Sequence, residues 1–145
     1  MIRVRSRTDY AVRILLAAAR HDSGKYIPGS RLQAETNVPR AFFRRIVAQL
    51  ANLGLLETVS GPRGGIRLAR PMQQINLREV VEGMEGRIAI SECIKGHDDC
   101  SFEEEACPTR FWWQQAQDAM LAQLEAATLD RLAVPLDASP SEVGV

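Results

Sequence analysis

Residues 30–54 contain the pattern on which the predicted fold of this chain rests, S-R-L-Q-A-E-T-N-V-P-R-A-F-F-R-R-I-V-A-Q-L-A-N-L-G. Ser30–Thr36 has the pattern of a short helix with Ser30 as its cap, and Asn37-Val38-Pro39 interrupts it. A longer helix is predicted over Pro39–Leu53, because proline suits a first turn and Gly54 a helix end. Its predicted inward face consists of Phe42, Ile46, Gln49/Leu50 and Leu53. Two helices joined by so short a turn predict a helix-turn-helix.

The residues that follow predict a β-hairpin. Leu55–Ser60 is a candidate strand, Gly61–Gly65 a turn, and Ile66–Arg70 the returning strand, in which apolar residues alternate with Arg67. A hairpin directly after a helix-turn-helix is typical of a wing. Its glycines allow a close approach to the DNA backbone, and Arg63 at the tip supplies positive charge.

The flanking segments complete a mainly α-helical fold. Ser6–Arg20 is predicted to be a helix capped by Ser6, and Asn76–Gly83 a short helix capped by Asn76. From Pro108 an apolar stripe continues for roughly 24 residues, or about 36 Å of helix. The stripe comprises Trp113, Ala116, Met120, Leu124 and Ala127, widened by Leu121, Thr128 and Leu132. So long an apolar face indicates a dimerisation helix, the alternative being that it packs on its own domain.

The predicted fold class is therefore a winged helix-turn-helix DNA-binding domain with a small β-hairpin, followed by a long C-terminal dimerisation helix. We assign residues 1–75 to the DNA-binding domain and residues 76–132 to a cysteine loop and the dimerisation helix. Residues 133–145 contain two prolines and small polar residues, which predicts a disordered tail.

Charge divides the chain in the same way. Residues 1–70 hold 13 Lys and Arg against 4 Asp and Glu, a balance of +9, whereas residues 71–145 hold 5 against 14, a balance of −9. A basic first half suggests a polyanionic partner, here double-stranded DNA. The candidate contacts are Arg40, Arg44 and Arg45 on the longer helix, Arg3, Arg5 and Arg7 in a basic arm ahead of the first helix, and Arg63 in the wing. The alternative is a helix-turn-helix that contacts protein.

Several classes of protein are excluded. No nucleophile–base pair, phosphate loop or catalytic carboxylate pair stands out, so an enzyme is not expected. The chain has no apolar run of eighteen residues, which excludes a membrane-spanning helix, and its amino terminus lacks the apolar core of a signal peptide. We expect a cytoplasmic protein.

All three cysteines lie in one 15-residue stretch, C-I-K-G-H-D-D-C-S-F-E-E-E-A-C, residues 93–107. Six residues separate Cys93 from Cys100, and six separate Cys100 from Cys107. Three thiolates suit an iron–sulfur cluster, zinc or copper(I), and gaps of six are wide for a zinc knuckle. The alternative is one or two structural cysteines and a reactive thiol pair. His97 and Asp9 are candidates for a fourth ligand, with an exposed loop histidine and a helix-capping aspartate as their alternatives.

The motifs R-S-R-T-D-Y-A-V-R (residues 5–13), G-P-R-G-G-I-R-L (61–68) and L-R-E-V-V-E (77–82), with three cysteines before a long helix, resemble the Rrf2 family of bacterial winged-helix transcription regulators. The resemblance runs from residue 1 to about residue 132. It implies a homodimer on palindromic DNA whose affinity depends on a bound iron–sulfur cluster, 4Fe–4S or 2Fe–2S.

Site residues follow from the resemblance by position. Cys93, Cys100 and Cys107 match the family's cluster ligands. One branch places a histidine ligand three residues after the last cysteine, where this chain has Arg110. Another branch, which senses nitric oxide, uses a first-helix aspartate of the other subunit, and Asp9 matches it. The family's DNA contacts fall on Pro39, Arg40, Phe42, Arg44 and Arg45 in the recognition helix and on Arg63 and Gly64 in the wing.

The expected function is a DNA-binding transcriptional regulator, a repressor, whose operator affinity depends on an iron–sulfur cluster. The signal would be nitric oxide, redox state or iron–sulfur status. The alternative is a cluster-free regulator that responds to thiol chemistry or to a metal.

Overall fold

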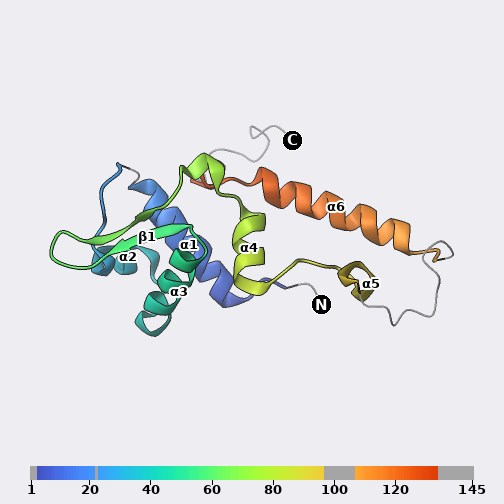
Figure 1. The fold of residues 1–145 in the computed structure, drawn as a ribbon, viewed down its shortest axis with the longest axis horizontal. Coiled ribbons are helices and arrows are strands. Elements are labelled where there is room, and N and C mark those ends of the chain that lie inside the picture. Colours follow the sequence, from blue (N-terminus) through green and yellow to red (C-terminus); the bar gives the residue numbers. More distant parts are fainter. Residues whose placement is uncertain (1–2, 22, 97–106, 134–145) are drawn as a thin grey trace.

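The structure is a computed structural model that describes residues 3–21, 23–96 and 107–133. Its helices and strands are arranged in an elongated molecule, with the helix-turn-helix and hairpin at one end and α5 at the other (Figure 1). In chain order they are α1 (Ser6–Arg20), α2 (Gly29–Thr36), α3 (Arg40–Asn52), β1 (Leu56–Val59), β2 (Gly65–Leu68), η1 (Met72–Gln74), α4 (Leu77–Glu85), α5 (Glu92–Lys95), α6 (Arg110–Ala126) and α7 (Leu129–Leu132).

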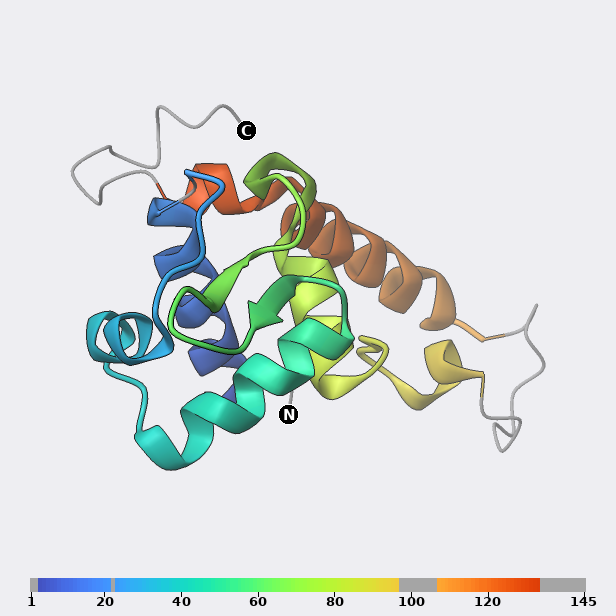
Figure 2. The ribbon, with the colours of Figure 1, turned by 60° about the vertical axis from the view of Figure 1, so that its left-hand side comes forward.

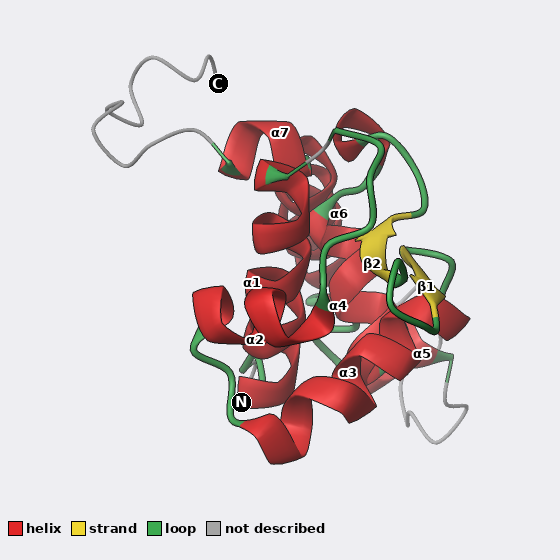
Figure 3. Cartoon of the chain, turned by 90° about the vertical axis from the view of Figure 1, so that its left-hand side faces the viewer, coloured by secondary structure: helices red, strands yellow, loops and turns green. Residues whose placement is uncertain are grey.

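Helix α1 is the centre of the core. Helices α2, α3, α4 and α7 and strand β2 all pack against it, and Figure 3 shows α1 surrounded by them. Ala11, Ile14 and Leu15 of α1 are fully buried. Small residues near its end, such as Ala18, let neighbouring elements approach closely. Val80 of α4 and Leu129 of α7 are buried in the same cluster, so residues 1–75 and 76–132 share one core.

Two predicted helix caps are wrong. Helix α1 begins at Ser6 with Arg5 in the N-cap position and no capping side chain. Instead the Glu85 carboxylate, at the end of α4, accepts hydrogen bonds from the Arg5 backbone N–H at 2.9 Å and the Thr8 hydroxyl at 2.5 Å. Helix α2 likewise begins one residue before Ser30, with Pro28 at its N-cap. A contact with a residue 77 positions away leaves no local sequence signal.

The predicted inward face of the recognition helix is partly wrong. Ile46 and Leu50 of α3 are buried as expected, but Phe43 is buried in place of Phe42, which is 46% exposed. Leu53 follows the last residue of α3 and is 38% exposed. The buried residues of α3 are Phe43, Ile46, Val47 and Leu50, which share one helical face at spacings of three and four, and Phe42 lies outside that face.

The hairpin forms as expected. Strands β1 and β2 are antiparallel, with Leu56 opposite Leu68 and Val59 opposite Gly65. Ile27 adds a bridge on the other side of β2, exchanging two backbone hydrogen bonds of 2.8 Å with Ile66. Gly64 and Gly65 are required here, because a Cβ atom on Gly64 would lie 2.0 Å from the Val59 oxygen and one on Gly65 2.2 Å from the Ile27 oxygen.

The C-terminal helix is shorter than predicted. Helix α6 has 17 residues and ends at Ala126 rather than continuing to residue 132. The chain leaves the helix because Thr128 pairs with Asn76 and the Leu129 N–H donates to the Ile75 oxygen at 2.9 Å. Helix α7 then buries Leu129 completely. Tertiary pairing therefore overrides a helical pattern that continues past residue 126.

Two further expectations concern the ends of the chain and the membrane. Within residues 3–21, 23–96 and 107–133, no helix is both long and apolar enough to cross a membrane. The tail expected to be disordered falls, apart from Ala133, outside the described residues.

Candidate DNA-binding surface and cysteine segment

The arginines of the recognition helix lie on its outer surface. Arg40, Arg44 and Arg45 are all exposed, whereas Ile46 and Leu50 on the inner face are buried. In the described part of the chain none of these three arginines forms an ion pair or a side-chain hydrogen bond. Figure 2 shows α3 on the outside of the molecule with only its inner side against the core. This face can therefore meet a polyanion without first breaking internal contacts.

Phe42 and Pro39 add an apolar element at the start of the same helix. Pro39 is exposed at the N-cap. The Phe42 ring rests against Tyr10 of α1, with the ring centroids 6.1 Å apart. An exposed aromatic beside arginines suits contact with a thymine methyl group or a sugar.

The wing and the N-terminal arm extend the basic surface. Arg63 is exposed at the hairpin tip next to Gly64. Arg3 and Arg5 are exposed ahead of α1. Arg7, expected in the arm, lies within α1, and its guanidinium donates to the Met84 oxygen at 2.8 Å. The arm is thus shorter than predicted.

Several arginines outside this surface form ion pairs in the described part of the chain. Arg31 pairs with Glu35, Arg70 with Glu79, and Arg78 with Glu82 and Glu125. Arg40, Arg44 and Arg45 of α3 and Arg63 of the wing form none among the described residues, and they lie where a winged helix-turn-helix meets DNA.

Two of the three cysteines lie in the described part of the chain. Cys93 is in α5, and its sulfur lies 3.0 Å from the Ser91 hydroxyl. Cys107 precedes α6, with its sulfur 3.6 Å from the Thr109 hydroxyl. The hydrogen bond from Thr109, followed by backbone N–H groups and the charge of Arg110, lowers the pKa of the Cys107 thiol. Both thiols are partly exposed. Cys100 and the candidate ligand His97 lie outside the described residues.

Gln117 holds the chain that enters the cysteine segment, and sequence reasoning missed it. It is 3% exposed and is the buried residue of α6. Its side-chain amide donates to the Ile88 oxygen at 2.6 Å, and its side-chain oxygen accepts from the Ile90 N–H at 3.1 Å. A polar residue within a predicted apolar stripe was the available signal. Through these bonds α6 positions the backbone that leads to Cys93.

Asp9 lies near the start of α1, where its carboxylate forms an ion pair with Arg13 at 2.8 Å. Helix α1 is separated from α5 in both Figure 1 and Figure 2. Among the residues that the structure describes, no three His, Cys, Asp or Glu side chains converge on a common point. The structure therefore does not bring Asp9 together with Cys93 and Cys107 of the same chain.

The fold and this surface define a class of protein. A winged helix-turn-helix with unpaired arginines on its recognition helix and wing is a DNA-binding regulator of transcription. A family model described as Rrf2, iron-dependent transcriptional regulator, matches residues 4–135. The chain belongs to the Rrf2 family, whose members are transcriptional regulators rather than enzymes.

Individual proteins agree with this assignment. The chain is 34% identical over 133 residues to Protein aau3 of Rhizobium meliloti, covering 90% of this chain and 84% of that protein. It is 31% identical to the HTH-type transcriptional regulator NsrR of Halalkalibacterium halodurans, covering 88% and 87%. The solved structure of CymR, the global cysteine regulator of B. subtilis, shares the fold with a TM-score of 0.74 at 21% identity, covering 92% and 97%.

Proposed function

We propose that this protein is a homodimeric repressor that binds a palindromic operator and whose affinity is set by an iron–sulfur cluster. The cluster would be held by Cys93, Cys100 and Cys107 of one subunit and by Asp9 of the partner subunit. We assign DNA contacts to Arg3, Arg5, Pro39, Arg40, Phe42, Arg44, Arg45, Arg63 and Gly64. The observation that carries the DNA part is the set of unpaired arginines on α3 and the wing.

The surface of α6 supports the dimer. Phe111, Trp112 and Trp113 at its start are 61%, 68% and 46% exposed in the single chain. Adjacent large aromatics at such exposure are typical of an interface rather than of a monomer surface. A second copy of α6 would cover them and would also give the two-fold symmetry that a palindromic operator requires.

The donor set fits a cluster of soft metal ions. Cys93 and Cys107 are reachable from solvent, and the lowered pKa of Cys107 favours the thiolate, which is the form that binds metal. The family description, iron-dependent transcriptional regulator, agrees with iron as the metal. When bound, the cluster would supply a centre that reacts with nitric oxide or with oxidants.

The residues of the chain supply the connection to DNA. To act as a ligand, Asp9 must leave Arg13, and an exposed ion pair of this kind contributes at most about 1 kcal/mol. Asp9 stands on α1, against which α3 packs. Binding of Asp9 to the cluster, or its release, would therefore shift α1, the helix against which the recognition helix α3 packs. A difference of about 1–3 kcal/mol between the two states changes operator affinity by roughly five- to 150-fold.

A mixed dimer tests the assignment of Asp9. One chain carries Asp9→Ala with its cysteines intact, and the other carries Cys93→Ser, Cys100→Ser and Cys107→Ser with Asp9 intact. We expect the anaerobically purified mixed dimer to keep one cluster with wild-type optical and Mössbauer spectra, whereas the Asp9→Ala homodimer shows altered spectra. If the mixed dimer instead has the spectra of the Asp9→Ala homodimer, Asp9 does not act between subunits.

A second candidate is a cluster-free regulator that responds through its thiols. The lowered pKa of the partly exposed Cys107 favours it, as does the fold shared with a protein described as a cysteine regulator. Anaerobic purification separates the two candidates. A brown protein supports the cluster, and a colourless protein with full DNA binding supports the thiol regulator.

A further inference from the structure

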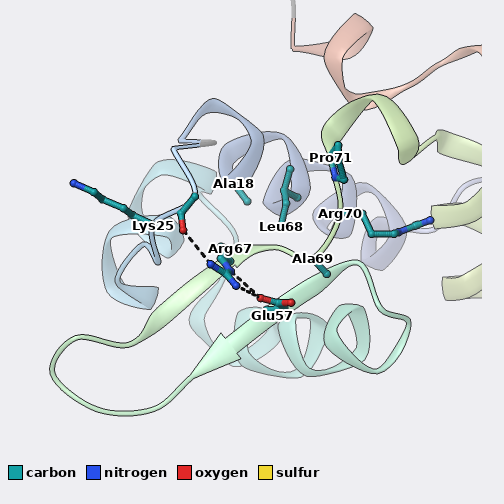
Figure 4. A pocket seen from close by; sticks show the side chains of 9 residues that line it. Ala18, Lys25, Glu57, Arg67, Leu68, Ala69, Arg70 and Pro71 are labelled. Carbon is teal, nitrogen blue, oxygen red and sulfur yellow. Dashed lines mark hydrogen bonds and ion pairs between the residues drawn. The ribbon is translucent and has the colours of Figure 1, made fainter.

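Arg67 has the most interactions of any arginine in the hairpin, yet it does not lie at the hairpin tip. It stands on β2 directly opposite Glu57 of β1. Its guanidinium donates to one Glu57 carboxylate oxygen at 2.7 Å, and another of its nitrogens donates to the Gly24 oxygen at 3.0 Å. Figure 4 shows Arg67 between Glu57 and the backbone of the loop beside Lys25.

Tyr26 completes this arrangement from the same loop. The Arg67 guanidinium lies over the Tyr26 ring, 4.5 Å from its centroid. The Tyr26 hydroxyl is 3.5 Å from the Glu57 carboxylate. One side chain of the wing is thereby joined to the other strand and to the loop that follows α1. We call Tyr26, Glu57 and Arg67 the wing clamp.

The base of the wing is anchored in the core, where Leu56 and Ile66 are buried and β2 packs against α1. Its strands have four residues each, and a two-stranded hairpin of that size is marginally stable on its own. Apart from the clamp, β2 is tied to the loop by the single bridge between Ile27 and Ile66. The buried side chains and this bridge hold one face of the hairpin. Because neighbouring side chains on a strand point to opposite faces, the clamp holds the other face.

We propose that Arg67 is a positioning residue for DNA binding, which holds the wing at the angle where Arg63 meets the DNA and does not itself contact DNA. The geometry supports this, because all three groups that Arg67 engages belong to the protein, while Arg63 at the tip engages none in the described residues. The proposal rests on the proposed DNA binding. It assigns opposite roles to two arginines of the same hairpin.

Salt dependence separates positioning from contact. An arginine that neutralises a phosphate adds to the number of counterions released when DNA binds. Its loss therefore lowers the salt slope, which is the slope of the logarithm of the binding constant against the logarithm of the salt concentration, by about one. A positioning residue changes affinity with little change in slope. Glu57→Gln adds a test of sign, because removing a negative charge near DNA strengthens binding by simple electrostatics but weakens it if Glu57 is part of the clamp.

The experiment uses the full-length protein purified anaerobically and a duplex recovered by the wild type from a random-sequence pool. Binding is measured over a salt series for Arg67→Met, Arg67→Lys, Glu57→Gln and the Arg67→Met/Glu57→Gln double variant. Arg63→Ala serves as the contact control. Lys25→Ala, which removes an exposed positive charge from the loop that carries Tyr26, serves as the charge control.

We expect Arg67→Met, Arg67→Lys and Glu57→Gln each to weaken binding by about three- to tenfold, the range that one exposed ion pair and one cation–π contact can supply together. Their salt slopes stay at the wild-type value, the double variant is no weaker than the weaker single variant, and Arg63→Ala lowers the slope by about one. If Arg67→Met fails to fold, Arg67→Lys and Glu57→Gln test the proposal in its place.

Three results would overturn the clamp. The first is that Arg67→Lys and Arg67→Met bind DNA with wild-type affinity. The second is that Arg67→Met lowers the salt slope as much as Arg63→Ala does. The third is that Glu57→Gln binds DNA more tightly than the wild type. If the wild type recovers no duplex, the proposed DNA binding fails and the clamp fails with it. If only the clamp proposal fails, the wild type still binds DNA with its normal salt dependence, and Arg63→Ala still lowers that dependence.

Discussion

Phe42 and Phe43 are neighbours in the chain with opposite surroundings. Phe43 is 5% exposed in the core, and Phe42 is 46% exposed beside Tyr10 on the recognition helix. We expect Phe43→Ala to lower the free energy of unfolding by about 3–5 kcal/mol, because it leaves a cavity in the core. Phe42→Ala should lower it by less than about 1 kcal/mol and should weaken operator binding instead.

Urea unfolding measures the stability of both variants, and operator titration measures their DNA affinity. Each variant is the control for the other. A large stability loss in Phe42→Ala would mean that Phe42 belongs to the core, as the periodicity of α3 alone suggests. Unchanged operator affinity in Phe42→Ala would remove it from the DNA-binding surface.

Glu85 makes stability depend on pH. Partial burial raises its pKa, but hydrogen bonds from the Thr8 hydroxyl and the Arg5 N–H and the charges of Arg5 and Arg7 together bring it below the usual 4.5. Because the pKa is lowered on folding, the contribution of Glu85 is complete above about pH 4.5 and is lost as the pH falls through the lowered value.

We expect Glu85→Gln to be less stable than the wild type by about 1–2 kcal/mol at neutral pH, as for the loss of a charge-assisted hydrogen bond. The difference should shrink in acid. Chemical denaturation of both proteins across the acid range measures it. A constant difference at every pH would show that the charge of Glu85 is not responsible.

At the scale of single residues, sequence patterns predicted what depends on neighbours in the chain. The Asn76 cap is confirmed, since its side chain accepts from the Glu79 N–H three residues on. The Ser6 and Ser30 caps are wrong, because Arg5 and Pro28 occupy the N-cap positions. Glu85 and Gln117 act on distant segments, and such contacts leave no periodic signal.

Most residues of helix α6 are exposed in the single chain. Only Gln117 among its residues is buried, and its first turn carries three exposed aromatics. We expect the double variant Trp112→Ala/Trp113→Ala to weaken dimerisation by about 30-fold or more, since a buried interface tryptophan contributes about 2 kcal/mol. The stability of the subunit should change little.

Sedimentation equilibrium over a range of protein concentrations measures this effect. Gln115→Ala, an exposed polar residue on the same turn, is the matched control and should dimerise like the wild type. A double variant that remains dimeric to the same dilution would place the interface elsewhere and leave the aromatics for another partner.

The elements themselves were largely predictable. The helix-turn-helix and the hairpin follow from local rules of capping, turn residues and alternation, and the structure confirms them. The end of α6 was not predictable, because the chain turns at Ala127 to pair Thr128 with Asn76 and bury Leu129. Those partners lie some fifty residues away, and the apolar stripe continues past the break.

For the whole molecule, the charge division has a spatial counterpart. The arginines of the proposed DNA-binding surface lie on α3 and the wing at one end. Cys93, within α5, and Cys107, just before α6, lie at the other end (Figure 1). Helices α1 and α4 stand between them and pack together. A change in the ligand bound at the cysteine segment can therefore alter DNA binding only through these helices or through the partner subunit.

The proposed function requires that the occupancy of the cysteine segment control DNA affinity. One anaerobic preparation is divided, half is stripped with an iron chelator, and both halves are titrated against the duplex recovered by the wild type, with the Cys93→Ser/Cys100→Ser/Cys107→Ser variant as control. We predict that stripping changes the affinity at least about fivefold and that the serine variant matches the stripped half with or without chelator. A wild-type protein that is colourless as isolated and binds DNA equally before and after stripping would contradict it.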